Sequence, residues 1–471
     1  MEKLIGRKKK IAILQDCYAT DKSEFVAVYG RRRVGKTFLI TETFQNKFFF
    51  QVEGILNEKI QTQLKNFHTE IIKAGGSHLP KAESWLQAFK NLNTLVQQSK
   101  NTQKKVIFLD EIPSMATKNS GFLEALGHFY NRYASRRKDI LLIICGFASS
   151  WIVEYIVDNQ GGLHNRLTRQ LLLQPFTLLE CETYLKSRQI DWDRYQISEA
   201  YMILGGIPYY LSLLFNKLSF HQNIDALYFS PDGPLFYEYD HLFASLFKKP
   251  QGHLAVVQAL AKVSQGMTRN DLESANSALN NGYLTKVLTD LIQCGFLRAY
   301  QAYKKKTRDT LYQLIDPFTL FHLRFESIRK TQAKDYWLHF SFTPAHNTWA
   351  GLAFERVCLN HLEQIRKALG ISGVLTQVYS WRSKSSIPGA QIDLVLKRAD
   401  NIIHLCEVKY SIKPFKIDKQ YAALLREKRF VFLSETGAKA AHTTLISTYG
   451  LTGNTYAGEI LFQLTLDDLF Q

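Results

Sequence analysis

The sequence predicts an α/β protein of several domains: a P-loop parallel-sheet core with a helical lid, a winged helix-turn-helix and a C-terminal α/β domain like that of restriction endonucleases. Two observations predict the core. Apolar strand-like runs alternate with helical patterns over residues 25–175, and the first run is followed by the phosphate-binding pattern G-x-x-x-x-G-K-[ST]. A third observation, an aspartate followed by Glu-x-Lys on the next strand, predicts the C-terminal domain. At about 150 residues a domain, the 471 residues allow about three domains.

The phosphate-binding loop is flanked as its pattern requires. Residues 25–29 are β-formers typical of a buried parallel strand, and residues 38–42 continue as a helix. Unpaired N–H groups and the positive end of the helix dipole should therefore face an anion. We expect Lys36 to reach the β- and γ-phosphates of ATP and the Thr37 hydroxyl to ligate Mg2+. The residues expected to bind the nucleotide here are Gly30, Arg31, Arg32, Arg33, Val34, Gly35, Lys36, Thr37 and Phe38.

A second acidic motif follows some 70 residues later. Residues 106–109 are apolar and end in Asp110 and Glu111. Acids at the carboxyl end of a buried strand lie where open α/β sheets bind ligands. We expect Asp110 to hold Mg2+, directly or through water, and Glu111 to polarise the attacking water. Further strands are expected at 48–52, 140–146 and 170–173, and helices at 57–73 and 84–99.

Charge and cysteine content limit the partners. The chain has 59 Lys and Arg against 42 Asp and Glu, a formal net charge of +17. This balance favours a polyanionic partner, and DNA is the one expected; the alternative is dispersed charge on a soluble protein. The six cysteines are scattered without a C-x-x-C pair, which fits a reducing cytoplasm. No run approaches the ~18 apolar residues of a membrane span, so no membrane partner is expected.

The middle of the chain predicts a DNA-binding module. We assign residues 1–175 to the core, 176–248 to the lid and 249–330 to a winged helix-turn-helix. Three helices are expected at 253–264, after an N-cap at Thr268, and at 283–293, followed by strands at 296–301 and 310–315. Lys286 would lie on the recognition helix, and the lysines of the hairpin would meet phosphates. The alternative is a winged helix that serves as a protein–protein spacer. The hairpin's basic residues are Lys304, Lys305, Lys306 and Arg308.

The last domain, assigned to 335–471, carries a second constellation. Asp393 precedes Glu407-x-Lys409 by 14 positions, which is the core of the PD-(D/E)xK nuclease pattern. Asp393 and Glu407 would bind Mg2+ beside a scissile phosphate, and Lys409 shares a strand face with Glu407. Glu355 is a candidate outer ligand, while Gln420 and Tyr421 could support the site. The alternative is an ordinary strand with alternating charges.

Hairpin geometry gives a test of this site. In an antiparallel pair, directly opposed residues share a face. Asp393 and Glu407 share one only if the loop between their strands has an odd number of residues. A three-residue loop at 399–401, with Asn401 in the left-handed conformation, satisfies this condition.

The chain resembles the prokaryotic AAA+-like ATPases often labelled "archaeal ATPase", of the signal-transduction ATPase group. Four segments carry the resemblance. They are the phosphate-binding loop, the Asp110-Glu111 pair, Gly6-Arg7 and Gly205-Gly206-Ile207-Pro208-Tyr209-Tyr210. It implies that Gly6, Arg7 and Pro208 border the adenine. It also implies that Arg166 is a γ-phosphate sensor or an arginine finger in a possible homo-oligomer, with Arg169 as the competing choice.

The chain departs from this family's pattern in two places. Lys8, Lys9 and Lys10 replace the usual glutamates after the Gly-Arg segment. Phe147 stands where a polar sensor usually follows the strand, although Ser149 or Ser150 could substitute. Both departures bear on hydrolysis more than on binding. Residues 350–471 also resemble the C-terminal domain of unknown function found behind these ATPases, through "SWR", "GAQIDLVL", "LCEVKYS" and "LTLDDLF".

These patterns together predict a Mg2+-dependent ATPase that binds DNA and cleaves or processes it through the C-terminal domain. One alternative is an ATP-switched, DNA-bound regulator with a nuclease-like domain that does not cut. Another is a motor whose C-terminal domain recruits a partner.

Overall fold

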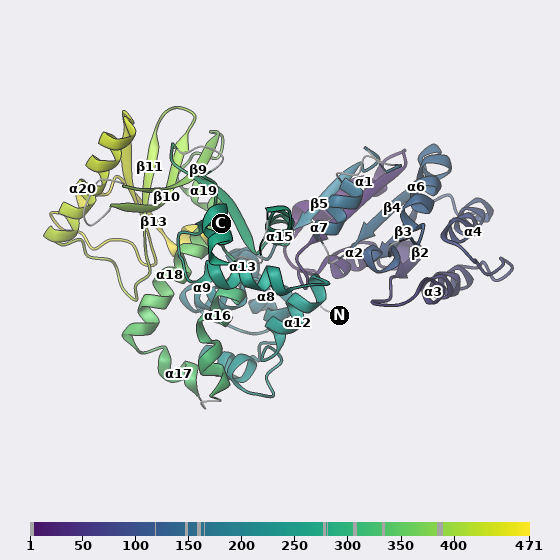
Figure 1. Ribbon diagram of the computed structural model, residues 1–471, viewed down its shortest axis with the longest axis horizontal. Helices are drawn as coiled ribbons and strands as arrows, with labels where there is room; N and C mark the ends of the chain where they lie inside the picture. Colours follow the sequence, from purple (N-terminus) through teal and green to yellow (C-terminus); the bar gives the residue numbers. More distant parts are fainter. Residues whose placement is uncertain are drawn as a thin grey trace. The chain divides into compact units, whose positions relative to one another are not determined.

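The computed structural model divides into two compact units, Met1–Pro175 and Phe176–Gln471 (Figure 1). For residues 149, 281 and 393 it describes the backbone only. Within the described part of the chain, no helix is both long and apolar enough to cross a bilayer. The described residues are 4–117, 119–146, 149–157, 162–163, 165–276, 279, 281–304, 309–331, 335–383 and 390–471.

The first unit is built on a five-stranded sheet in which every pair of neighbouring strands is parallel. The strand order is β2-β3-β4-β1-β5, which confirms the predicted parallel sheet. All residues of β3 and β4 are buried, as expected of central strands whose two faces are covered. The strands are β1 (Glu24–Gly30), β2 (Phe48–Glu53), β3 (Lys105–Asp110), β4 (Ile140–Cys145) and β5 (Arg169–Leu173).

Helices cover both faces of this sheet. Side chains alternate along each strand, so apolar side chains lie on both faces and pack against these helices. Ile107 and Leu109 join an apolar core with residues of α3, α4 and α6. Phe108, between them, packs 5.9 Å from the Phe48 ring, which in turn neighbours Phe44 of α2 at 6.3 Å. The helices are α1 (Lys8–Ala19), α2 (Lys36–Phe44), α3 (Ile60–Lys73), α4 (Trp85–Gln98), α5 (Ile112–Met115), α6 (Phe122–Arg132) and α7 (Ser149–Ile152).

The second unit is organised around helix α9 (Arg194–Leu204), whose residues 197–204 are all buried. It packs against α8 (Leu178–Ser187), α16 (Pro317–Lys330) and α18 (Pro344–Asn360). Capping boxes at Thr177 and Asp193 start α8 and α9 by satisfying free backbone N–H groups. Other short helices of this region are α10 (Pro208–Ser212), α11 (Phe220–Ile224), α12 (Glu238–Leu246) and α17 (Tyr336–Phe340).

The three helices and the hairpin expected after residue 249 are present in the predicted order. Thr268 caps the second of them, because its side chain accepts from the Asp271 N–H while Asp271 accepts in return. β6 and β7 both pair antiparallel with β8. The elements are α13 (Gln251–Ala261), β6 (Met267–Thr268), α14 (Arg269–Ala275), α15 (Asn281–Gln293), β7 (Leu297–Ala302) and β8 (Leu311–Leu314).

The C-terminal strands and the hairpin strands form one sheet, whereas the sequence predicts two separate domains. β7 pairs in parallel with β9, Gln301 lying opposite Tyr379, and the order is β13-β12-β11-β10-β9-β7-β8-β6. Tyr303, just after β7, packs in the same apolar cluster as Trp381 and Phe432. The remaining elements are α19 (Leu362–Ala368), β9 (Thr376–Arg382), β10 (Gln391–Arg398), β11 (Ile403–Lys409), α20 (Lys419–Thr436), β12 (Ala441–Ser447) and β13 (Phe462–Thr465).

Candidate functional site

The phosphate-binding loop joins β1 to α2 in the first unit. Gly30 ends β1 at φ 149°, and a Cβ there would collide with the Leu173 carbonyl on β5, so only glycine fits. Gly35 precedes α2 at φ 85°. Lys36 is buried, and its Nζ donates to the Gly30 and Arg31 carbonyls, both at 3.0 Å. The ammonium is thus held against the loop at the first turn of α2, where an anion is favoured.

Thr37 and Asp110 meet beside this loop. The Thr37 hydroxyl donates to Asp110 Oδ2 at 2.6 Å, and the Glu111 N–H donates to Asp110 Oδ1 at 2.9 Å. The contact brings a hydroxyl from α2 and a carboxylate from β3 to one point at the carboxyl edge of the sheet. Hard oxygen donors of this kind are what Mg2+ prefers, so the pair fits the predicted cation.

Two further acids lie at the same edge. Glu53 ends β2 directly opposite Asp110, and burial, together with the Asp110 charge, raises the pKa of Glu53. Glu111 has φ 50°, a conformation that is uncommon outside glycine and that marks functional sites when the surroundings enforce it. A cation here would relieve the repulsion between these carboxylates.

At the end of β4, Cys145 is fully buried, and burial, followed by the Asp110 charge, raises the pKa of its thiol. Phe147 lies outside the described residues. Of the two serines predicted to substitute as sensor, Ser150 belongs to α7, and the side chain of Ser149 is not described. The sensor therefore stays a prediction.

The Gly6-Arg7 segment lies against the phosphate-binding loop. Gly6 and Arg7 have φ values of 67° and 58°, and they turn the chain into α1. Arg7 Nη2 donates to the Val34 carbonyl at 3.4 Å. The segment therefore contacts the loop, as its predicted role near the nucleotide requires. Lys8 and Lys9, exposed in the first turn of α1, add positive charge on this side.

Arg166 and Arg169 lie at the opposite end of the sheet. β5 runs parallel to β1, with Arg169 opposite Val26 and Leu173 opposite Gly30. Four residues of strand separate Arg169 from the loop end by ~13 Å, and Arg166 precedes it. Burial raises the pKa of Tyr130, and the charge of the nearby Arg166 opposes that shift. Glu24, the first residue of β1, also acts on Tyr130, so Arg166 lies near the amino ends of the strands. Neither arginine therefore lies beside the phosphate-binding loop of its own chain. The role of Arg166, or of Arg169, as γ-phosphate sensor or arginine finger stays a prediction.

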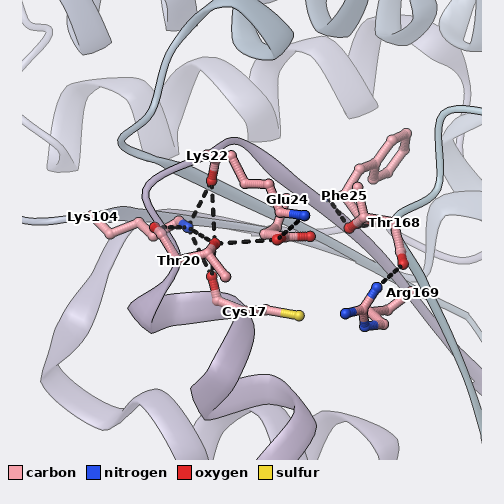
Figure 2. A network of polar contacts seen from close by, with 8 residues as sticks. All are labelled: Cys17, Thr20, Lys22, Glu24, Phe25, Lys104, Thr168 and Arg169. Atoms are coloured by element: carbon pink, nitrogen blue, oxygen red, sulfur yellow. Dashed lines mark hydrogen bonds and ion pairs between the residues drawn. The ribbon is translucent and has the colours of Figure 1, made fainter.

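The same end of the sheet holds a polar network that anchors α1 (Figure 2). Lys104 Nζ donates to the carbonyls of Cys17, Thr20 and Lys22 at 2.7 to 2.8 Å and to the Thr20 hydroxyl. The Thr20 hydroxyl also lies 3.1 Å from Glu24 Oε1. The negative end of the helix dipole stabilises a cation placed at the carbonyls of a helix C-terminus. Helix α1 is thus tied to the phosphate-binding loop at one end and to β1 and β3 at the other.

The glycine-proline motif belongs to the second unit. Gly205 ends α9 at φ 66°, and Pro208 opens α10. Gly206 has φ 64°, and its carbonyl accepts from the Phe176 N–H at 2.8 Å. Each residue suits its position because glycine tolerates positive φ and proline suits the first turn of a helix. The role of Pro208 toward the adenine stays a prediction.

The hairpin that carries the C-terminal acids has the predicted loop. The Arg398 N–H donates to the Ile402 carbonyl at 2.9 Å, and Asn401 has φ 68°. Residues 399–401 therefore form the three-residue loop, and Leu394 lies opposite Cys406. The pairs continue without a slip to Lys397 opposite Ile403, so the odd, three-residue loop predicted from the sequence is confirmed.

Glu407 is held by two side chains of α20. Lys428 Nζ donates to Oε1 at 2.6 Å, and the Tyr421 hydroxyl donates to Oε2 at 3.1 Å. Burial, then the Glu407 charge, raises the pKa of Tyr421. Lys409 Nζ lies 5.0 Å from the centre of the Tyr421 ring. Glu355 lies on α18, which packs against β11. Among the residues whose side chains are described, no three potential ligands gather into a metal cluster.

The basic residues of the predicted DNA-binding module divide into two groups. Lys286 is exposed on α15, as expected of a recognition helix. Lys304, at the hairpin, donates instead to the Thr436 carbonyl at the end of α20. Lys305, Lys306 and Arg308 lie outside the described residues.

Comparisons with known proteins find relatives of the part of the chain that holds the phosphate-binding loop. Residues 4–214 match the family described as an ATPase domain predominantly from Archaea. This region is therefore similar to the ATPase domains of that family. An uncharacterised protein of Methanocaldococcus jannaschii is 24% identical over 441 residues, which are 92% of this chain and 93% of that protein. A Walker-type ATPase of Pyrococcus abyssi has 16% identity and a TM-score of 0.50, covering 68% of this chain and 96% of that one. The latter likeness shows a shared fold.

A short match names the ligand of another relative. An uncharacterised ATP-binding protein of Methanocaldococcus jannaschii is 40% identical over 43 residues, which are 9% of this chain and 73% of that protein.

Sequence reasoning missed two residues that the fold brings to these sites. Glu53 joins Asp110 at the edge of the ATPase sheet, and an acid closing a predicted strand was the available signal. Lys428 reaches Glu407 from α20. It lies seven residues after Tyr421, two helical turns away, and therefore on the same helix face.

Proposed function

We propose that the chain binds and hydrolyses ATP with Mg2+ and uses this cycle to switch the handling of DNA by its second unit. The contact between Thr37 and Asp110, 2.6 Å apart beside the phosphate-binding loop, is the observation that carries the ATPase proposal. A Mg2+ ion bound there would neutralise charge on the phosphates. The printed name of the ATP-binding relative agrees with ATP as the nucleotide.

The chain's own residues have distinct roles in this proposal. Lys36 exchanges its two loop carbonyls for phosphate oxygens, which are stronger acceptors because they are charged. Glu111, next to Asp110 at the end of β3, orients the attacking water and takes up its proton. Arg7 and the first lysines of α1 attract the nucleotide. Arg166, exposed at the far edge, would serve another copy in a homo-oligomer.

DNA is supported as the partner by charge and by the order of elements. The formal net charge is +17, and α13, α14, α15 and the β7–β8 hairpin follow the winged-helix order. Lys286 is exposed on the third of these helices. The docking of Lys304 on α20 favours a hairpin that braces the C-terminal strands, with α15 as the DNA-contacting element.

DNA cleavage is a second candidate, favoured by the three-residue hairpin loop and by the pairing of Leu394 with Cys406, which continued by one position would set residue 393 opposite Glu407. In this proposal Asp393, Glu407 and the outer ligand Glu355 hold a metal, and Lys409 steadies the charge that develops on the phosphate.

Location in the cytoplasm remains the expectation.

Calorimetry and DNA binding together test this function. The parent should bind ATP, Lys36→Ala should lose it, and Glu111→Gln should bind but release phosphate at least ~100-fold more slowly, since it keeps shape and loses the base. DNA affinity, followed by fluorescence anisotropy at several salt concentrations, should differ between ATP and ADP. Unaltered ATP binding by Lys36→Ala would refute the nucleotide site. Plasmid nicking with Mn2+ that disappears in Asp393→Ala would establish the second candidate.

A further inference from the structure

The carboxylate of Glu407 already has a cation within the chain. Lys428 forms an ion pair with it at 2.6 Å, and the side chains of Glu407 and Lys428 are only 11% and 18% exposed. The second oxygen accepts from the Tyr421 hydroxyl. A divalent metal at Glu407 needs the same oxygens. Since two cations at one carboxylate repel one another, the metal and Lys428 compete for Glu407.

The two lysines near Glu407 differ in their surroundings. Lys409, which the Glu-x-Lys spacing singles out, lies over the rings of Tyr421 and Phe415, with its Nζ 5.0 and 5.9 Å from their centres. Lys428 alone forms the ion pair described for Glu407. Its four-carbon stem can rotate the ammonium away while the helix stays in place.

Helix α20 itself is fixed at both ends. The Asp418 side chain accepts from the Tyr421 N–H at 2.8 Å, and Gly437 ends the helix in the left-handed conformation. Lys304 from the β7–β8 hairpin donates to the Thr436 carbonyl in the last turn. The resting position of Lys428 on Glu407 therefore follows from a well-anchored helix.

We propose that Lys428 is a built-in competitor of divalent metal at Glu407, so that this site takes up Mg2+ or Mn2+ only when the Lys428 ammonium is withdrawn. The inference rests on the C-terminal metal site of the second candidate function and adds its regulation. In the resting chain the Lys428 ammonium, and not a metal ion, neutralises the Glu407 carboxylate. A bound nucleic-acid phosphate is the ligand class that would draw the ammonium away, because it offers a lysine an alternative anion.

Mn2+ titration of the full, nucleotide-free chain tests this competition. Isothermal calorimetry and thermal melts would compare the parent with Lys428→Gln, Lys428→Arg and Glu407→Gln. We expect Lys428→Gln to bind Mn2+ at least ~10-fold more tightly, about the worth of one charge-assisted hydrogen bond. Lys428→Arg should resemble the parent because it keeps the cation. Glu407→Gln should lose this response and report only the metal bound by the ATPase domain.

Lys419→Gln is the matched control, because Lys419 is an exposed lysine in the first turn of the same helix. If Lys428→Gln proves too unstable to titrate, Lys428→Met keeps the apolar stem and allows the same comparison. Equal Mn2+ affinity in the parent and the neutral variants would overturn the competition while leaving a metal site in place. No Glu407-dependent Mn2+ binding in any of them would overturn both the inference and the cleaving function, and would leave ATP and DNA binding untouched.

Discussion

Protonation of His361 should weaken the second unit at mildly acidic pH. His361 lies between α18 and α19 with no exposed surface. Its Nε2 accepts from the Leu178 N–H at 3.0 Å, and its Nδ1 lies 2.8 Å from the Val357 carbonyl. These partners require the neutral ring with the proton on Nδ1. Burial lowers the pKa of His361 from 6.5 to about 4, although the Val357 carbonyl opposes the shift.

The sign and size of the effect follow from the two pKa values. Between pH 6.5 and 4 the unfolded chain binds more protons than the folded chain, so stability falls as pH falls. The full lowering of the pKa corresponds to about 3 kcal/mol, at about 1.4 kcal/mol for each pKa unit. With both titrations included, the loss between pH 8 and pH 5 is about 2 kcal/mol. It removes the Leu178 contact at the start of α8, just beyond the junction of the two units.

A neutral variant isolates this residue from the other buried histidines. His361→Gln keeps an acceptor and a donor but does not titrate. The free energy of unfolding of the parent and the variant, from urea titrations at pH 8 and pH 5, should therefore converge by about 2 kcal/mol toward acid. Exposed His339→Gln is the control and should show no convergence. A gap between the parent and His361→Gln that is the same at both pH values would refute the reasoning.

Two further outcomes follow from single contacts. Gly206→Ala should destabilise the second unit by several kcal/mol, because residue 206 has φ 64° and its Cβ would lie 2.6 Å from Tyr201 Cε2; an unaltered melting temperature would contradict this. Lys304→Ala removes the bond to the Thr436 carbonyl, so it should lower the melting temperature of the second unit while leaving the salt dependence of DNA binding nearly unaltered. A flatter salt slope, measured by anisotropy, would instead show that the Lys304 ammonium contacts DNA phosphates.

The sequence by itself determined the features that depend on neighbouring residues. The phosphate-binding loop, the buried strand ending at Asp110 and the cap at Thr268 are each encoded within about ten residues. The loop at 399–401 belongs with them. Side chains alternate along a strand, so an odd number of loop residues decides which side chains of the two strands lie on the same face. These predictions succeed because local backbone geometry and apolar periodicity act over short stretches of chain.

Only the tertiary structure decided which distant residues meet. The order of strands in the sheet placed Glu53 beside Asp110 and moved Arg166 to the edge away from the phosphate-binding loop. The docking of α20 placed Lys428 on Glu407, and the pairing of β7 with β9 merged two expected domains into one sheet. Spacing along the chain cannot encode these outcomes, because strand order and helix docking result from burying apolar faces far apart in the sequence.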